Sequence, residues 1–205
     1  DVIIEITCAL EDRWMVEQEV ELSSINPGYR GFHEFFGMPP SSSTGPSMSG
    51  SCNVDVACPQ SATWENEIDC VGVISSGGAL FCTGFMVNNT AQDETPYFLT
   101  AEHCGISNGN DQSVVVYWNH QNSYCRTPGS SDSGGNGNGN YNQSTSGSTY
   151  LASNSTYDFC LIRMNSDPNA SYGVTFSGWS RSSSTPSHGV GIHHPNCAEK
   201  RISSV

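Results

Sequence analysis

Residues 82 to 104 constrain the fold more than any other stretch of the sequence. Cys82 and Cys104 bracket two short apolar runs, Phe85-Met86-Val87 and Tyr97-Phe98-Leu99. Both runs have the composition and length of β-strands. Residues 88 to 93, which separate them, are rich in turn-forming side chains. The stretch therefore predicts a β-hairpin, and a bridge between the two cysteines would tie its ends together, which contributes roughly 3 kcal/mol in the chain-entropy model.

A histidine lies directly before the second of these cysteines, at position 103. A bridge would hold the imidazole at a fixed place on a rigid frame, as a general base requires. The alternative is a structural disulfide beside a histidine with no chemical role. The His-Cys pair alone favours that alternative, and the wider pattern reverses it.

The wider pattern resembles a known family. Residues 82–90 and 97–104 are similar to the histidine segment of chymotrypsin-like serine proteases, and more narrowly to the bacterial lysyl endopeptidases. The resemblance covers about residues 47 to 205, and it is carried by the following further segments: Ser51–Pro59, Val115–Asn119, Tyr157–Leu161, Gly178-Trp179 and Ile192–Ser203. It implies an all-β fold, a chymotrypsin-like double β-barrel with the first barrel complete and the second incomplete.

The same resemblance implies a secreted serine endopeptidase that acts on polypeptides, as a monomer and without cofactor or metal. His103 would be the general base and Asp158 its partner. The pairings Cys82–Cys104 and Cys58–Cys125 carry over from the family. The pairing of the remaining cysteines and the side-chain specificity stay open. We expect the sequence to stop within the second barrel, before the nucleophile serine.

Asp158 also stands out from the residues alone. It lies in the apolar run from Tyr157 to Ile162, where an unpaired charge would be costly. His103 is its natural partner, and a carboxylate there would hold the imidazole tautomer. The alternative is an ordinary aspartate at the edge of a strand, with Asp111 as the next candidate for the histidine's partner.

Residues 126 to 149 are a low-complexity stretch of Gly, Ser and Asn, for which we expect an exposed loop. Within it, Ser131-Asp132-Ser133-Gly134-Gly135 imitates the nucleophile motif of this protease class. A nucleophile needs a rigid turn beside oxyanion-hole amides, and the glycines and asparagines that follow do not predict one. We therefore expect no nucleophile at Ser133.

Charge and cysteine content exclude several classes of protein. Only 13% of the residues are charged, the net charge is −13 and there are nine cysteines. No Cys-x-x-Cys motif occurs, so the cysteines indicate an oxidising, extracellular setting. The negative charge argues against nucleic acid or an anionic membrane as a partner. No apolar run is long enough to span a membrane.

Residues 1 to 46 differ from the rest, with eight acidic and two basic side chains and a Pro/Ser-rich end at 39–46. We expect the end of a propeptide plus a linker there, followed at 47–205 by the N-terminal part of the protease domain. A small accessory β-unit is the alternative. Strands are predicted at 70–74, 80–87, 97–100, 114–118, 174–179 and 189–194, with a hairpin turn at 75–78.

Three histidines near the end, His188, His193 and His194, raise the question of zinc. Adjacent histidines on a strand point to opposite faces, so they do not form one site easily. No metal site is expected. The competing interpretation of the whole chain is a catalytically inactive, protease-like binding module.

Overall fold

The computed structural model describes residues 49–204, so the predictions for residues 1–46 lie outside the described part. Strands dominate, with one short helix, α3 (Glu65–Asp69), among the described elements. The strands are β1 (Val54–Asp55), β2 (Val71–Ser76), β3 (Ala79–Met86), β4 (Tyr97–Thr100), β5 (Val115–Trp118), β6 (Ser144–Ser146), β7 (Ser148–Asn154), β8 (Phe159–Met164), β9 (Val190–His193) and β10 (Arg201–Ser204). Short 3-10 turns are η3 (Pro59–Ser61), η4 (Glu102–Cys104), η5 (Asp111–Ser113), η6 (Ala170–Tyr172) and η7 (Pro195–Cys197).

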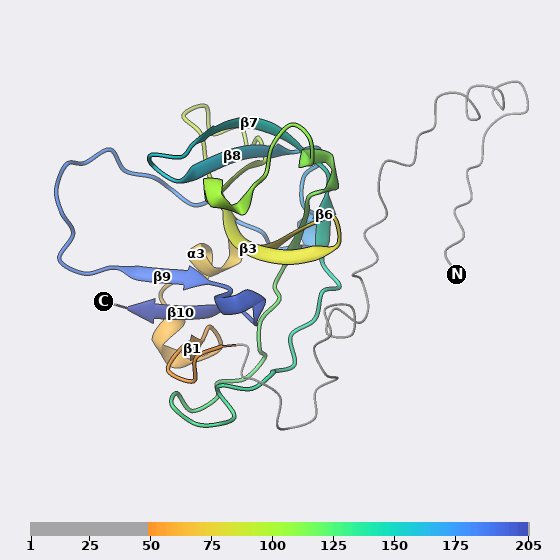
Figure 1. Cartoon of the computed structure of the whole chain (residues 1–205). Helices are drawn as coiled ribbons and strands as arrows, with labels where there is room; N and C mark the ends of the chain where they lie inside the picture. Colours follow the sequence, from red (N-terminus) through yellow and green to blue (C-terminus); the bar gives the residue numbers. More distant parts are fainter. Residues whose placement is uncertain (1–48, 205) are drawn as a thin grey trace, which may run out of the picture.

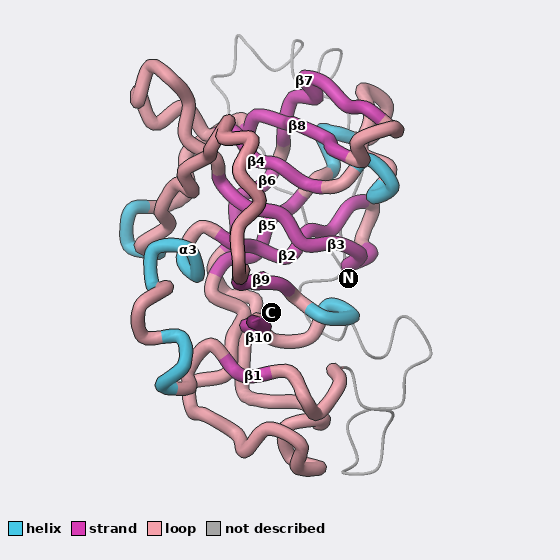
Figure 2. The backbone as a smooth tube through the Cα atoms, turned by 90° about the vertical axis from the view of Figure 1, so that its left-hand side faces the viewer, coloured by secondary structure: helices cyan, strands magenta, loops and turns pink. Residues whose placement is uncertain are grey.

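Seven strands form one curled antiparallel sheet in the order β6-β5-β2-β3-β4-β8-β7 (Figures 1 and 2). The two outer strands, β6 and β7, are separated along the chain only by Gly147. The Gly147 N–H donates to the Val114 carbonyl before β5, and its carbonyl accepts from the Asn165 N–H after β8. The continuous stretch 144–154 therefore joins both ends of the sheet and closes it into a barrel. This stretch bends at Gly147, whose positive φ of 78° is one that glycine adopts without strain.

The hairpin predictions for this barrel are confirmed. β2 and β3 are joined by Gly77 and Gly78, which have φ values of 57° and 92° and connect the Ser76–Ala79 pair. Two glycines at positive φ are what a two-residue hairpin turn needs. The next hairpin pairs Phe85 in β3 with Leu99 in β4, as the apolar runs around residues 85 and 98 predicted.

The barrel interior is filled by apolar side chains from every wall. Ile74, Met86, Phe98, Val116 and Ile162 have no exposed surface and belong to one cluster. Close approach of β3 to β4 requires a glycine at position 84. A Cβ there would lie 2.2 Å from Cε1 of the Phe98 ring, which is below any real contact distance. The packing at this point therefore leaves no room for a side chain at position 84.

A second sheet contains three strands in the order β1-β10-β9 (Figure 2). Figure 1 shows this small sheet below the barrel, with β9 and β10 antiparallel to each other. The arrangement is the expected all-β, chymotrypsin-like fold with a complete first barrel and an incomplete second one. The strand expected at 174–179 is wrong: within the described chain this segment makes only one isolated bridge, between Val87 and Ser177.

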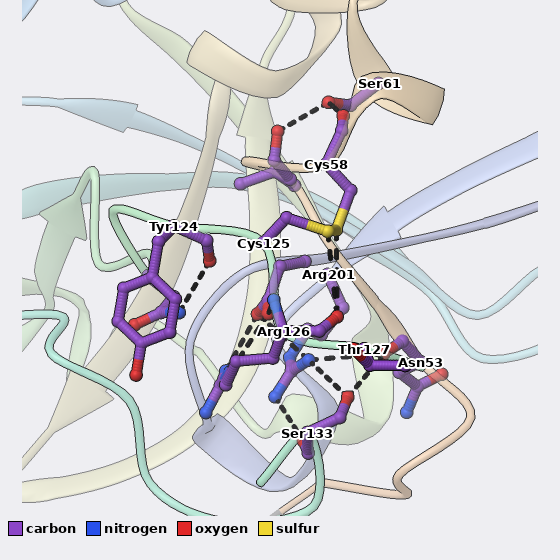
Figure 3. The surroundings of a disulfide bond; sticks show 12 residues. Asn53, Cys58, Ser61, Tyr124, Cys125, Arg126, Thr127, Ser133 and Arg201 are labelled. Carbon is purple, nitrogen blue, oxygen red and sulfur yellow. Dashed lines mark hydrogen bonds and ion pairs between the residues drawn. A yellow bond between two sulfur atoms is a disulfide. The ribbon is translucent and has the colours of Figure 1, made fainter. Parts of the chain in front are cut away.

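The stretch 126–149 is only in part the exposed loop that its composition indicates: residues 127–129 and 131–132 are exposed, but several others are buried and the end of the stretch forms β6 and the start of β7. Arg126 and Ser133 are 1% and 0% exposed. Arg126 donates from Nη2 to Asp55 Oδ1 at 2.7 Å, and Arg201 lies 2.9 Å from the same oxygen. Figure 3 shows both arginines beside the Cys58–Cys125 disulfide, with Ser133 next to them. A buried ionic cluster therefore anchors the loop to β1 and β10.

The charges of this cluster are paired: both arginines contact Asp55, and a carboxylate oxygen of Glu199 lies 3.8 Å from Arg126 Nη2. Burial alone would raise the pKa of Asp55, but the hydrogen bonds from Arg126 and the charges of Arg126 and Arg201 outweigh it and lower the pKa. Arg126 also donates to the Gly135 carbonyl at 2.9 Å, and Arg201 donates to the Ser133 carbonyl at 2.8 Å. Charges that are paired and hydrogen-bonded in this way are the form in which a protein interior accepts them.

Candidate active site

His103 lies in η4, the single 3-10 turn that follows β4. The preceding strand is held on both sides, because β4 pairs with β3 and with β8. The next residue, Cys104, is bonded to Cys82 of β3, with a Cα–Cα distance of 6.2 Å. Gly105 then ends the turn in the left-handed conformation, with φ 75°. The imidazole is thus attached to a rigid frame although its own side chain is 71% exposed.

Asp158 lies just before β8, and the β4–β8 register brings it to His103. Thr100 pairs with Cys160 across the two strands, so the residues just beyond that pair lie next to each other. Asp158 Oδ1 accepts from the backbone N–H of His103 at 3.0 Å. Its Oδ2 lies 2.7 Å from His103 Nδ1. One carboxylate thus binds both the backbone and the ring of the same histidine.

The reason for expecting Asp158 to have a partner was wrong in one respect. Its side chain is 50% exposed, and it precedes the strand instead of being embedded in it. Its φ of 50° lies in the left-handed region, which aspartate enters more readily than most residues. A turn conformation, not burial within a strand, therefore directs the carboxylate toward His103.

The Asp158 contact determines which imidazole nitrogen faces outward. With Nδ1 donating to the carboxylate, Nε2 carries the lone pair, and it makes no hydrogen bond to any residue of the described chain. The backbone and side-chain hydrogen bonds from His103 lower the pKa of the Asp158 carboxyl, so the carboxylate form is favoured. An imidazole held in this tautomer can accept a proton at Nε2.

Asp111, the other candidate for this role, has a different function in the structure. Its side chain is buried, and Oδ2 accepts from the Tyr150 N–H at 2.8 Å while Oδ1 accepts from the Gln112 N–H at 2.9 Å. The Asp111 carboxylate therefore fixes the start of β7 against η5. It does not contact His103.

Both expected disulfides are present. Besides Cys82–Cys104, Cys58 and Cys125 are bonded with a Cα–Cα distance of 4.6 Å. Sulfurs of Cys82 and Cys104 and a ring nitrogen of His103 lie within 4.8 Å of one another, in the spacing of a metal site. Because both sulfurs are consumed in the disulfide, they are not the thiolates that zinc binds.

Comparison with known proteins identifies the family of this chain. Residues 47–205 match the family model described as the C-terminal domain of lysyl endopeptidase. The chain belongs to the lysyl endopeptidase family.

One curated relative in this family is the lysyl endopeptidase of Pseudomonas aeruginosa. It is 29% identical over an alignment of 167 residues, which covers 76% of the present chain and 34% of the relative. This lysyl endopeptidase-family chain thus spans about a third of the length of that relative. Within residues 49–204, no helix is long and apolar enough to cross a membrane.

The buried cluster of Asp55, Arg126 and Arg201 was missed by sequence reasoning. Arg126 directly follows Cys125, and Asp55 precedes Cys58 by three positions. The signal was available, because charged residues are scarce in this sequence and two of them flank the cysteines of one disulfide. Cys52, Cys70, Cys160 and Cys197 form no disulfide in the described part of the chain.

Proposed function

We propose that the protein is part of a secreted serine endopeptidase that hydrolyses peptide bonds by acyl transfer. The observation that supports this most directly is the pairing of His103 Nδ1 with the Asp158 carboxylate at 2.7 Å. It occurs in a chain whose residues 47–205 match the lysyl endopeptidase family. His103 is the proposed general base and Asp158 the residue that orients it.

The proposed reaction uses the free Nε2 of His103. This nitrogen takes the proton of a serine hydroxyl as the serine attacks the scissile carbonyl, and later returns a proton to the leaving amine. Asp158 stabilises the imidazolium in between, since its carboxylate stays at Nδ1. The attacking serine and the oxyanion-hole amides are assigned to parts of the enzyme outside the 205 residues.

Ser133 does not suit the nucleophile's role in this proposal. Its side chain has no exposed surface. Its hydroxyl donates to the Asn53 carbonyl at 3.3 Å and accepts from Arg201 at 3.4 Å. A hydroxyl enclosed in an ionic cluster cannot reach a polypeptide substrate. The motif around residue 133 is therefore assigned to folding, and the nucleophile is sought elsewhere.

The remaining parts of the proposal follow from the cysteines and the family. Residues 1–46 are proposed to be the end of a propeptide with its linker, and 47–205 the first part of the protease domain. Two disulfides suit an oxidising extracellular compartment. The relative's name specifies cleavage at lysine, which makes lysine the first side chain to test in the substrate, ahead of arginine and small or apolar residues.

The test uses the full-length enzyme of which this chain is a part. A fluorophosphonate probe and a library of peptide esters would measure acylation and specificity. His103→Ala should reduce the rate of acylation by about 10⁴-fold or more, as for other members of a triad. His188→Ala is the matched control, because His188 is exposed and lies outside the site. An unchanged rate in His103→Ala would refute the assignment.

A full-length protein that folds, yet neither reacts with the probe nor hydrolyses any ester, would instead support the inactive binding module. Labelling of the 205-residue chain at Ser133 would contradict the proposed location of the nucleophile. Mass spectrometry of the labelled peptide distinguishes these outcomes, since it identifies the acylated serine directly.

A further inference from the structure

The sequence contains the acceptor motif for N-linked glycans, Asn-x-Ser/Thr, at four places. They are Asn88-Asn89-Thr90, Asn142-Gln143-Ser144, Asn154-Ser155-Thr156 and Asn169-Ala170-Ser171. In a chain this rich in Asn, Ser and Thr, such triplets also arise by chance. Local structure has to distinguish among them.

Asn169 has a geometry suited to an acceptor. It is exposed and caps the N-terminus of η6. Its Oδ1 accepts two hydrogen bonds from Ser171, one from the backbone N–H at 2.9 Å and one from the hydroxyl at 2.8 Å. Hydrogen bonds to the carboxamide oxygen make the Nδ2–H proton easier to remove, and Nδ2 itself has no partner in the described chain. Both bonds span only two residues, so they can form before the chain has folded.

The other three triplets lack this hydroxyl bond in the described structure. Asn88 is half-buried, and its backbone bonds to residue 177 beside the barrel. The triplet of Asn142 ends at Ser144, which is fixed in β6 opposite Tyr117. Asn154 uses its Oδ1 to accept the Tyr157 N–H at 3.0 Å, which closes the turn before β8. Among the four asparagines, Asn169 therefore has the side-chain geometry that is best suited to modification.

A cavity of about 540 Å³ lies directly beside Asn169 and includes it in its wall. Val174 and Phe176 supply half-buried apolar surface to this wall. Asp93, Glu94 and Asp167 add carboxylates. An apolar wall with a few polar groups that can accept hydrogen bonds suits a sugar ring, which has apolar C–H faces and hydroxyl and N-acetyl donors.

We propose that Asn169 carries an N-linked glycan and that the first N-acetylhexosamine of this glycan lies in the adjacent cavity. The transfer forms a bond between Asn169 Nδ2 and C1 of the sugar. It breaks the C1–O bond to a lipid diphosphate donor, which leaves as the free lipid diphosphate, while Nδ2 gives up one proton. The inference rests on the secretory route within the proposed function but not on His103, so the two can fail separately.

The position of this glycan leaves the candidate active site open. Thr95 and Pro96 line the cavity and immediately precede β4, whereas His103 follows the same strand. A four-residue strand spans roughly 13 Å. The sugar would cover the end of the barrel away from His103 and would shield Val174 and Phe176 there.

The experiment expresses the 205-residue chain, fused to a secretion signal, in a yeast or insect secretory host. Peptide-N-glycosidase treatment in heavy-oxygen water, followed by mass spectrometry, reads occupancy at each of the four asparagines. We expect Asn169 to have the highest occupancy. Ser171→Ala should abolish modification at Asn169 alone, and Ser171→Thr should retain it. Asn165→Gln, an exposed neighbour outside any acceptor motif, is the matched control and should change nothing.

Unmodified Asn169 in the parent chain, or unchanged modification in Ser171→Ala, would overturn the proposal. The transfer takes place during synthesis. If the chain is not secreted, the same mass-spectrometric analysis of the protein retained inside the secretory compartments therefore still gives the occupancy of Asn169. The cavity contact has its own readout. After trimming to one sugar, backbone amides at 93–96 and 173–176 should exchange hydrogen more slowly than in Asn169→Gln. Equal exchange rates would refute the contact.

Discussion

The carboxylate of Asp158 accepts two hydrogen bonds from a single residue, His103: one from its backbone N–H at 3.0 Å and one from its Nδ1 at 2.7 Å. The first bond fixes the turn and the second fixes the ring. The orientation of the imidazole is therefore tied to the path of the main chain, so the two residues are positioned together although they lie 55 positions apart in the sequence.

Replacing Asp158 with asparagine should separate geometry from charge. Asparagine tolerates the left-handed φ of 50° at this position, so the fold should be retained. In the full-length enzyme we expect kcat to fall by about 10⁴-fold, because an amide no longer enforces the tautomer with its lone pair at Nε2. Burst kinetics with a peptide ester provide the measurement.

Asp111→Asn is the comparison for that variant. Asp111 accepts backbone hydrogen bonds near β7 and does not touch His103. Its substitution should lower stability with little effect on kcat per folded molecule. A larger loss of kcat for Asp111→Asn than for Asp158→Asn would contradict the assignment of the pair.

Removal of the Cys82–Cys104 bond by a double alanine substitution should destabilise the protein by about 3 kcal/mol. The bond attaches the turn containing His103 to β3, so hydrogen exchange should also speed up at residues 101–105. The matched variant lacks Cys58 and Cys125. It should lose roughly 4 kcal/mol, since that loop is longer, and leave exchange at 101–105 unchanged. If both double variants speed up hydrogen exchange at residues 101–105 equally, the Cys82–Cys104 bond is not what holds this turn in place.

Arg126→Met should be among the most destabilising single substitutions, at about 3–5 kcal/mol. It leaves the buried Asp55 carboxylate with one arginine, Arg201, in place of two. Denaturant unfolding measures the loss. Asp55→Asn added to Arg126→Met should cost less stability than Asp55→Asn costs alone, because the contacts between Arg126 and Asp55 are already gone. A double variant that is less stable by the full sum of the two single losses would refute this coupling.

Two neighbouring groups, Lys200 and Cys70, should contribute to the stability above pH 8 with opposite signs. Burial lowers the pKa of Lys200 to about 8, against roughly 10.4 when unfolded. The unfolded state therefore binds more protons in this window, and the free energy of unfolding rises with pH. Burial raises the pKa of Cys70 to about 11, against roughly 8.5 when unfolded, so its contribution falls as pH rises.

The Cys70→Ala variant should show the contribution of Lys200 to stability without the opposing contribution of Cys70. Between pH 8 and 10 the free energy of unfolding of this variant should rise by about 2 kcal/mol relative to that of the parent, because the opposing contribution of Cys70 is gone. Lys200→Met added to Cys70→Ala should remove the rise. Urea unfolding after alkylation of the exposed Cys52 provides the data. A Cys70→Ala profile that the added Lys200→Met leaves unchanged would show that Lys200 is not the titrating group.

Features with a local signal could be predicted from the sequence. The hairpins around Gly77 and between Phe85 and Leu99 have strand composition and turn residues within a few positions. The strand predicted at 174–179 failed because composition alone does not supply a partner: β3 and β4 are already paired to each other there, and only Ser177 reaches Val87.

The environment of the 126–149 loop could not be predicted, because its burial depends on residues far away in the sequence. Arg126 and Ser133 are enclosed by contacts to Asp55 and Arg201, and Gly137 donates to the Glu199 carboxylate at 2.7 Å. None of these partners is visible from the local composition. Small residues here signal close backbone approach: a Cβ at Gly139 would lie 2.7 Å from Glu199 Cγ.

The pairing of β1 with β10 joins Val54 to Ile202, near the two ends of the described chain. A ribosome releases Val54 long before Ile202 exists, so the first strand must wait without its neighbour while the entire barrel is made. Loop-closure entropy has to be overcome across all of that length, which makes assembly of this sheet slow. During this interval the Asp55 carboxylate lacks Arg201, and we expect the small sheet to form after the barrel.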